Sequence, residues 1–382
     1  MAENNLVKGF NDYTGEEAEK REEIRKILVS TFEKYGFEPA ETPILEIESF
    51  VRGDNAQDGV VSDIFKLKDK GERNLALRYE FTFQLKRIAK NKKLPYKRYQ
   101  IGPVFRDEPV SANRFRQLTQ CDVDIIGSSI ADEAEILSLA GKIIESLKVK
   151  CKIFVNSRKL LNEILDSIGI SENKEQVLRE IDKLDKLPEK VIIANLKKYE
   201  AEKILQSLKK PESYFKKYGS YKEIEELKKY CNMYGLKIEF LPSLVRGLSY
   251  YNGNVFEIKS EGVKETISAG GSYLINGVQS TGISFGLERL CSVSKLSVSD
   301  ESILIVSLNK DKESIHLAEK LRAKRKKILV YYGRPSKALE YANSKKIEKV
   351  IFVGEEEIKK GKFKIKDLKT GKEEFLEKGL VV

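Results

Sequence analysis

The segment that most constrains the fold is a strand, a polar loop and a second strand in immediate succession. Residues 99–105 (YQIGPVF) and 114–127 (RFRQLTQCDVDIIG) are typical of strands, and the loop DEPVSAN lies between them. Two strands joined by so short a loop can form an antiparallel hairpin. We therefore expect a hairpin in the body of the chain.

The rest of the body is arranged around this hairpin in two strand-rich blocks. They cover residues 64–126 and 236–290, and a Lys- and Glu-rich helical stretch at 157–235 separates them. Residues 15–36 have apolar residues at helical spacing and end at Gly36, which is typical of a helix C-terminus. Strand blocks with helices added predict an α+β body in which the helical stretch is an insertion.

A separate basic domain is expected after a short Ser-rich linker at residues 293–300. From Glu301 onward there are 21 Lys and Arg residues and 13 Asp and Glu residues, so this part has a net charge of +8 out of the +11 of the whole chain. Such a basic terminal domain favours a polyanion partner such as nucleic acid, although lysine-rich faces can also serve solubility alone. Its elements predict a small α/β domain with a largely parallel sheet. In chain order they are a strand at 303–308, a helix at 315–324, a strand at 327–333, a helix at 337–346 and a strand at 349–354.

The histidine and cysteine content excludes several classes of site. His316 is the only histidine, so Ser-His-Asp or Cys-His catalysis would have to use it, and we expect it on a helix surface. The four cysteines form no C-x-x-C pair, which indicates reduced thiols in a cytosolic protein. No segment has the roughly 18 consecutive apolar residues of a membrane span, and the first residues lack the apolar run of a signal peptide.

The first of four polar clusters is LRYEFT at residues 77–82. If this segment is a strand, Arg78, Glu80 and Thr82 share one face, because side chains alternate along a strand. Such a face is solvent-exposed or lines a pocket. This cluster alone favours solvent exposure.

The second cluster is the hairpin itself. Arg106 lies where the first strand enters the loop, and Arg116 shares a strand face with Gln120, Asp122 and Asp124. Two arginines beside an amide and carboxylates suit a substrate with both phosphates and an amine, because arginine binds phosphate oxygens with two parallel hydrogen bonds. An exposed hairpin with paired ions is the alternative.

The third and fourth clusters follow the helical stretch. In LVRGLSYYNGNVFEI, Arg246 lies near the hydroxyls of Tyr250 and Tyr251, and the glycines of SAGGSY would let a ligand approach the backbone. In STGISFGLERL, a strand of small residues enters a helix through Gly286, and Arg289 lies in its first turns. A core tyrosine pair, a glycine turn and a helix surface are the ordinary explanations of these residues.

Taken in order, the clusters resemble the motifs of class II aminoacyl-tRNA synthetases, and specifically the histidyl-tRNA synthetase family. YGFEPAETPILE with Pro43 is similar to the dimer-forming first motif, FRDE with RFRQ to the second, and GISFGLER to the third. LVRGLSYYNGNVFE and AGGSY match two histidine-specific boxes, and QCDVDIIG is similar to archaeal and eukaryotic members. The resemblance runs from about Lys8 to residue 376 and includes IDKLDKL of the insertion.

The resemblance implies an α+β fold with an antiparallel-sheet catalytic core. Its expected divisions are a core at residues 1–155 and 236–295, a helical insertion at 156–235 and a C-terminal α/β anticodon-binding domain at 300–382. It also implies a cytoplasmic homodimer that acts on L-histidine and tRNA-His and is not attached to a membrane.

The implied reaction is ATP-dependent activation of histidine to histidyl-adenylate, followed by transfer to the 3′ end of tRNA-His. By resemblance, Arg106 would hold the α-phosphate, Arg116 and Arg289 the rest of the triphosphate, and Arg246 the reacting carboxylate and α-phosphate. Arg106 and Arg246 are therefore the expected catalytic residues. Fixed cations stabilise the developing charge without a protein nucleophile. Mg²⁺ would accompany ATP, but the sequence does not identify its ligands.

The resemblance also implies a set of residues that bind histidine. An α-amino group would be received by Glu80, Thr82 and Gln120, and the two imidazole nitrogens by Asp124 and Tyr251. The full expected set is Glu80, Thr82, Gln120, Asp124, Arg246, Tyr250 and Tyr251.

Three residues depart from the family pattern. Ser249 replaces Asp of R-G-L-D-Y-Y, and Ser272 and Leu274 replace Arg and Asp of A-G-G-R-Y-D, which concerns catalytic efficiency and the bracing of the pocket. Two other functions stay open. One is a catalytically silent paralogue acting as a regulatory subunit in histidine biosynthesis, as in ATP phosphoribosyltransferase. That paralogue lacks the terminal domain present here. The other is a basic RNA-binding protein without enzyme activity.

Overall fold

The chain folds into two compact units, residues 1–296 and 297–382, and each has its own hydrophobic core. The computed structural model describes residues 5–53, 63–111, 114–247, 250–260, 266–296, 302–324 and 326–376. Both units combine helices with sheets, so the predicted α+β class is confirmed. Every helix within the described residues is too short or too polar to span a lipid bilayer.

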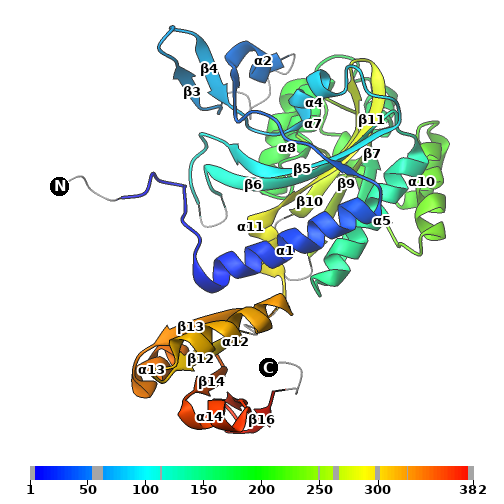
Figure 1. Cartoon of the computed structure of the whole chain (residues 1–382). Coiled ribbons are helices and arrows are strands. Elements are labelled where there is room, and N and C mark those ends of the chain that lie inside the picture. Colours follow the sequence, from blue (N-terminus) through cyan, green and yellow to red (C-terminus); the bar gives the residue numbers. More distant parts are fainter. Residues whose placement is uncertain are drawn as a thin grey trace. The chain divides into compact units, whose positions relative to one another are not determined.

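An eight-stranded sheet is the centre of the larger unit (Figure 1). In spatial order its strands are β1 (Glu38–Pro39), β5 (Tyr96–Phe105), β6 (Gln117–Ile126), β11 (Val278–Gly286), β10 (Thr266–Ile275), β9 (Tyr251–Ser260), β7 (Cys151–Ser157) and β8 (Glu239–Phe240). The six central strands are antiparallel to one another. The outermost strands are parallel to the strands beside them, β1 to β5 and β8 to β7.

The hairpin predicted from the sequence is formed by β5 and β6. The two strands pair antiparallel over their full lengths, from Tyr96 opposite Ile126 to Phe105 opposite Gln117. Along β6, Cys121, Val123 and Ile125 are fully buried in the main core. The residues between them point to the other face of the sheet, because side chains alternate along a strand.

Three helices cover the core face of this sheet. They are α1 (Gly15–Lys34), α5 (Ile130–Ser146) and α11 (Leu287–Val293). The first of them buries Ile24, Leu28 and Phe32, which recur at helical spacing, in the same core as β6. Gly36 follows with φ of +77°, the left-handed conformation that glycine tolerates after a helix end. These helices leave the opposite face of the sheet to form the site.

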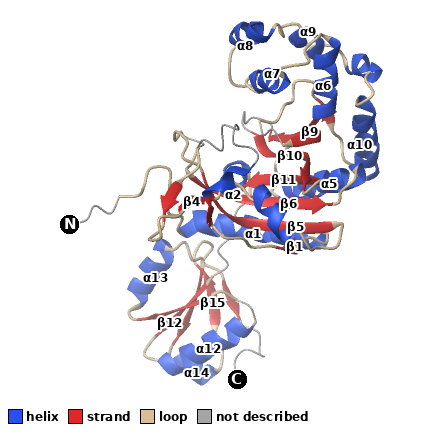
Figure 2. Cartoon of the chain, turned by 90° about the horizontal axis from the view of Figure 1, so that it is seen from above, coloured by secondary structure: helices blue, strands red, loops and turns tan. Residues whose placement is uncertain are grey.

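The insertion between β7 and β8 is helical, as predicted (Figure 2). Its apolar residues, such as Leu161, Ile192 and Leu227, join the main core. Its elements are α6 (Arg158–Ser167), α7 (Lys174–Ile181), α8 (Glu189–Leu196), η2 (Lys197–Tyr199), α9 (Ile204–Leu208), η3 (Glu212–Lys217) and α10 (Tyr221–Met233).

The prediction of a strand at residues 77–82 is wrong. The strand β4 (Asn74–Leu77) ends at Leu77, and the helix α4 (Thr82–Ile88) begins at Thr82. β4 is the middle strand of a small sheet with β2 (Leu45–Ile47) and β3 (Lys66–Lys68), and α2 (Glu48–Arg52) directly follows β2 in the chain. Solvent exposure is also wrong, since Arg78 and Glu80 are 4% and 5% exposed. These residues form an irregular connection with bends at Tyr79 and Phe81, in which Arg78 donates hydrogen bonds to Pro103 O and Thr42 O.

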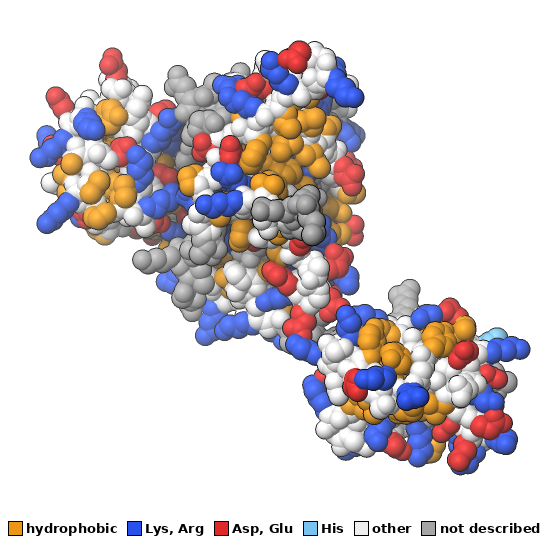
Figure 3. All heavy atoms as spheres, turned by 90° about the vertical axis from the view of Figure 1, so that its left-hand side faces the viewer, with side chains coloured by type: hydrophobic (Ala, Val, Ile, Leu, Met, Phe, Trp, Pro, Cys, Tyr) orange, Lys and Arg blue, Asp and Glu red, His pale blue; other side chains and the backbone are white. Residues whose placement is uncertain are grey.

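The smaller unit has the predicted α/β order. Its strands β13 (Ile328–Tyr332), β12 (Ile303–Ser307) and β14 (Lys349–Val353) are parallel, with α12 (Asp311–Ala323) and α13 (Pro335–Ser344) between them. The helix α14 (Glu355–Lys360) and the antiparallel strands β15 (Lys364–Asp367) and β16 (Glu373–Phe375) were not predicted. His316 lies exposed on α12, as expected (Figure 3).

Candidate active site

The polar face of β6 forms the floor of the site. Gln120, Asp122 and Asp124 are buried there, on the face opposite the main core. Small residues of β11 lie opposite them in the sheet register: Gly286, Ser284 and Gly282. A Cβ atom at Gly282 would lie 2.2 Å from Asp124 Oδ1, so a larger residue would collide with the carboxylate.

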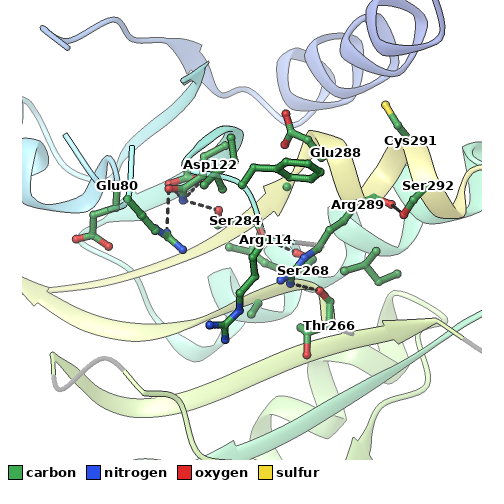
Figure 4. Close-up of a pocket in the computed structure, with 18 of the residues that line it drawn as sticks. Glu80, Arg114, Asp122, Thr266, Ser268, Ser284, Glu288, Arg289, Cys291 and Ser292 are labelled. Carbon is green, nitrogen blue, oxygen red and sulfur yellow. Dashed lines mark hydrogen bonds between the residues drawn. The ribbon is translucent and has the colours of Figure 1, made fainter. Parts of the chain in front are cut away.

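A cavity of about 1040 Å³ opens over this floor. Every residue expected at the site lines it, except Arg116. In Figure 4, Glu80 and Asp122 lie on one side of the cavity, and Glu288, Arg289 and Ser292 lie on the other. The expected residues that line it are Glu80, Thr82, Arg106, Gln120, Asp124, Arg246, Tyr250, Tyr251 and Arg289.

The structure does not bring Arg116 to the cavity. Its Nε donates to Glu108 O at 3.2 Å and its Nη2 lies 3.1 Å from Asp107 Oδ1. The backbone of Gly9, from the amino-terminal segment, bonds to the Arg116 N–H and packs against its side chain. Arg114, two residues earlier and on the same strand parity, lines the cavity instead (Figure 4).

At one end of the cavity a carboxyl group, an amide and a guanidinium meet. Arg106 donates from Nε to Tyr79 O at 3.3 Å and from Nη2 to Gln120 Oε1 at 3.5 Å. Burial raises the pKa of the Glu80 carboxyl to about 8, although the Arg106 charge opposes the shift. Gln120 Nε2 donates to Ser284 Oγ at 2.9 Å, which turns the amide oxygen toward Arg106.

Asp122 extends this group and was given no role from the sequence. Its carboxylate accepts hydrogen bonds from Gln120 Nε2 at 3.3 and 3.4 Å. Burial, together with the neighbouring Asp124 charge, raises the pKa of Asp122 to about 7. This part of the cavity therefore holds more acid groups than it can keep ionised in the absence of a bound cation.

Three tyrosines form the deep wall of the cavity. The ring centroids of Tyr250 and Tyr251 are 4.7 Å apart, and that of Tyr273 lies 5.5 Å from Tyr250. The Tyr250 hydroxyl donates to Glu80 Oε2 at 3.4 Å, and the Tyr273 hydroxyl donates to Asp124. Apolar ring faces with polar tips suit a flat ligand that also carries hydrogen-bonding atoms.

Arg246 reaches the cavity from a loop whose upstream part is anchored to β7. Its Nη1 lies 2.5 Å from Glu257 Oε1 on β9. Upstream, Asn156 Nδ2 donates to Pro242 O at 2.9 Å and to Leu244 O at 3.0 Å. A cation that is anchored in this way is positioned before a ligand arrives.

The helix α11 is tied to the sheet beside the cavity. Both Glu288 oxygens accept the Thr119 N–H at 3.1 Å, and Oε1 lies 2.9 Å from Arg21 Nη2. The next residue, Arg289, donates to Thr266 O at 2.6 Å, so its guanidinium lies along the cavity wall. Arg289 thus lines the same cavity as Arg106 and Arg114.

Two of the three departures from the family pattern have a structural counterpart. Ser272 donates to Glu133, which also accepts from Asn254 Nδ2 at 2.7 Å, and burial raises the pKa of Glu133 to about 7. A hydrogen bond between Ser272 and Glu133 thus occupies the position for which the resemblance implies an arginine. Leu274 is 48% exposed at the end of β10. Ser249 lies outside the described residues.

Comparison with known families identifies the larger unit. The family model described as histidyl-tRNA synthetase matches residues 9–290, and the anticodon binding domain matches residues 302–379. The chain belongs to the histidyl-tRNA synthetase family. A relative named histidine–tRNA ligase 1, from Bacillus cereus, is 34% identical over 96% of this chain and 94% of its own length.

Solved structures agree with this family fold. The histidyl-tRNA synthetase of Nostoc sp. matches with a TM-score of 0.86 and 24% identity, over 100% of this chain and 98% of its own. A Bacillus halodurans protein described as an ATP phosphoribosyltransferase regulatory subunit or histidyl-tRNA synthetase matches with a TM-score of 0.78 and 19% identity, over 92% and 98%. At these identities both likenesses concern the fold.

Residues that the sequence reasoning missed also reach this synthetase-like site. Arg114 and Tyr273 line the cavity, and Arg98 lies behind Asp124, with its Nη2 2.8 Å from Asp124 Oδ2. In the strand expected at residues 114–127, Arg114 has the same parity as Gln120, so this signal could have found it. Nothing in the local sequence around Arg98 or Tyr273 indicates their partner, because Asp124 belongs to a different strand from each.

Proposed function

We propose that this chain is a histidine–tRNA ligase, which activates L-histidine with ATP and transfers it from histidyl-adenylate to the 3′ end of tRNA-His. The observation that carries the proposal is one cavity whose lining combines arginines with tyrosines and buried carboxylates. Arg106 lies beside Glu80 and Gln120, and Arg289 lies on the side of the cavity away from Glu80 (Figure 4). The arginines suit the phosphates of ATP, and the tyrosines with carboxylates suit an amino acid with a polar ring.

The arginines would carry the chemistry of activation. We assign Arg106 to the α-phosphate, and Arg114 with Arg289 to the rest of the triphosphate; Arg114 replaces Arg116 because it lines the cavity. Arg246 would contact the reacting carboxylate and the α-phosphate. The attack of the carboxylate needs no protein nucleophile, so fixed cations that stabilise the developing charge are sufficient.

The tyrosines and buried carboxylates would bind histidine. Its α-ammonium group would lie among Glu80, Thr82 and Gln120, because carboxylate, hydroxyl and amide oxygens accept N–H donors. Asp124 and Tyr251 would each bind one ring nitrogen. Tyr250, which donates to Glu80, would support the first group.

Magnesium would accompany ATP. In the described part of the chain, no three His, Cys, Asp or Glu side chains gather as a metal site. A magnesium ion bound to phosphates keeps several waters and takes one or two protein carboxylates. Glu108 lines the cavity 3.6 Å from Arg114 and would fit such an ion, whereas Glu288 is already held by Thr119 and Arg21.

A regulatory paralogue is the second candidate function. Its support is the fold likeness to the Bacillus halodurans protein. Against it, the smaller unit matches an anticodon binding domain, and the cavity keeps its arginines. Exchange of pyrophosphate into ATP separates the two candidates, because a silent paralogue would not catalyse it.

The smaller unit should serve tRNA and not amino-acid chemistry, because all the lining residues lie in the larger unit. We expect a chain that ends near Ser299 to keep histidine-dependent pyrophosphate exchange and to lose most tRNA charging. Both activities are measured on the full and shortened chains, with thermal unfolding as a check that the larger unit stays folded. Equal charging by a folded, shortened chain would refute the anticodon-binding role.

Histidine binding should expel a proton from Glu80. Its pKa of about 8 means that the Glu80 carboxyl group is largely protonated at pH 7 when no substrate is bound. A bound ammonium group favours the ionised form of this carboxyl group. The KM for histidine should therefore rise roughly five- to tenfold as pH falls from 8.5 to 7, while the KM for ATP changes little. Glu80→Gln should bind histidine more weakly and lose this pH dependence. A flat wild-type profile would contradict the assignment.

We also propose a cytoplasmic homodimer. The cysteines at positions 121, 151, 231 and 291 form no disulfide, which suits a reducing compartment. Apolar side chains gather on the face of the larger unit shown in Figure 3. Ile44, Leu45 and Ile47, which follow Pro43 of the first motif, are 43%, 43% and 61% exposed. Exposed apolar groups so close together are typical of an interface.

Charge placed on this surface should dissociate the dimer. We expect Leu45→Glu with Ile47→Glu to shift the sedimenting mass from dimer toward monomer, because the interface would have to bury unpaired charges. Met233→Glu is the matched control, since Met233 is 67% exposed on the insertion and should leave the mass unchanged. A monomeric wild-type chain would exclude the homodimer.

A further inference from the structure

Arg98 is a buried cation without a role in the assignments above. It lies on β5, is fully buried, and is the largest fully buried side chain in the described residues. It stands directly opposite Asp124 in the β5–β6 register, with Nη2 2.8 Å from Asp124 Oδ2. A guanidinium is rarely buried so completely without a counter-charge. Asp124 supplies that charge.

The two oxygens of Asp124 have different surroundings. Oδ1 accepts a hydrogen bond from the Tyr273 hydroxyl. Oδ2 lies close to the Arg98 charge, yet no donor among the described residues makes an aligned hydrogen bond to it. Asp124 lines the cavity, and each oxygen of an ionised carboxylate has two lone pairs, so the carboxylate keeps acceptor capacity for a ligand.

The groups that face Asp124 from the other elements do not replace Arg98. Asp122 comes from β6 itself and Glu80 from the segment before α4, and both are acids. Tyr251 and Tyr273, from β9 and β10, are neutral hydroxyls. Burial raises the pKa of Asp124, and the Arg98 charge and the Tyr273 hydrogen bond oppose that shift. Without Arg98, burial and the nearby acids would favour a protonated Asp124.

We propose that Arg98 is a positioning residue for amino-acid recognition, because it holds Asp124 as an oriented carboxylate that accepts the N–H of the substrate's imidazole ring. The inference rests on the proposed function, since it takes histidine as the substrate. An ionised carboxylate only accepts hydrogen bonds, so it selects the ring tautomer with its proton on that side. A protonated Asp124 would also donate, and that selection would be lost.

The test compares three arginine variants with the wild type in pyrophosphate exchange between pH 7 and pH 9. Arg98→Met removes the charge, and Arg98→Lys keeps it. Arg158→Met is the matched control, because Arg158 is 5% exposed and pairs with Glu175 away from the cavity. The KM values for histidine and ATP are each divided by the wild-type value at the same pH, so that the titration of Glu80 cancels.

For Arg98→Met we expect the KM ratio for histidine to be roughly 30 at pH 7, as for a lost hydrogen bond to a charged group. It should fall at least about threefold by pH 9, because Asp124 then ionises without Arg98. The ATP ratio should stay near one. Arg98→Lys should recover most of the loss, and Arg158→Met should leave both ratios near one at every pH.

A double-mutant cycle covers the case in which Arg98→Met alone does not fold. Arg98→Met with Asp124→Asn removes both buried charges, and it should have the same KM for histidine as Asp124→Asn within about twofold, because Arg98 acts through Asp124. A further large loss in the double variant would overturn the inference. So would a pH-independent Arg98→Met in which the KM values for histidine and ATP rise together. A wild type without histidine-dependent exchange would instead refute the proposed function, and with it this inference.

Discussion

Arg246→Ala should reduce histidine activation by roughly 100- to 1000-fold, the size of losing one preorganised donor to charge that develops in the transition state. Arg246 lines the cavity and is held 2.5 Å from Glu257, on a loop anchored by Asn156. Its position is therefore fixed before substrates bind. The loss should appear mainly in kcat, because the contact strengthens as the reacting carboxylate attacks the α-phosphate.

Two further variants sharpen this prediction. Arg246→Lys should recover little, because a point charge does not reproduce the paired donors of a guanidinium. Lys259→Ala is the control: Lys259 lies 3.5 Å from the same Glu257 and 2.6 Å from Asp185, but it does not line the cavity. It should keep near-normal exchange. A folded Arg246→Ala chain with near-normal turnover would overturn the role of this arginine.

Asp124→Ala should lower kcat/KM for histidine by roughly 100-fold or more, or about 3 kcal/mol for a hydrogen bond to a charged group. The KM for ATP should change much less, because the phosphates are assigned to Arg106, Arg114 and Arg289. The measurement is exchange kinetics with each substrate varied in turn.

The same substitution should also destabilise the fold. It leaves the fully buried Arg98 without its counter-charge, which typically costs about 3–5 kcal/mol. Kinetics are therefore measured below the unfolding temperature of the variant. Unchanged KM and kcat for histidine would mean that Asp124 does not bind the ring.

Period-two alternation in the sequence correctly predicted which side chains of β6 form the floor of the site, but its prediction of a strand at residues 77–82 was wrong. It correctly placed Gln120, Asp122 and Asp124 on one face of β6. The same pattern at residues 77–82 belongs to an irregular connection, in which residues 78–81 are all buried, and to the start of α4. Hydrogen bonds from Arg78 to Thr42 and Pro103 hold this connection, and local alternation does not reveal partners so far along the chain.

The choice between two arginines was beyond local sequence. Arg114 and Arg116 have the same strand parity, so alternation does not distinguish them. Packing of Gly9 against Arg116 removes that side chain from the cavity, and Gly9 lies more than a hundred residues away in the sequence. The pairing of Arg98 with Asp124 likewise depends on the β5–β6 register. Long-range packing therefore supplies what motif spacing does not.

Pyrophosphate exchange with each of the twenty amino acids, on the full chain with ATP and Mg²⁺, tests the central claim most directly. Histidine should support rapid exchange, and an amino acid without a ring nitrogen should not, because it would leave the Asp124 carboxylate buried and unpaired. Exchange with histidine alone is the predicted result. No exchange with histidine, or equal exchange with another amino acid, would contradict the assignment of this cavity to histidine activation.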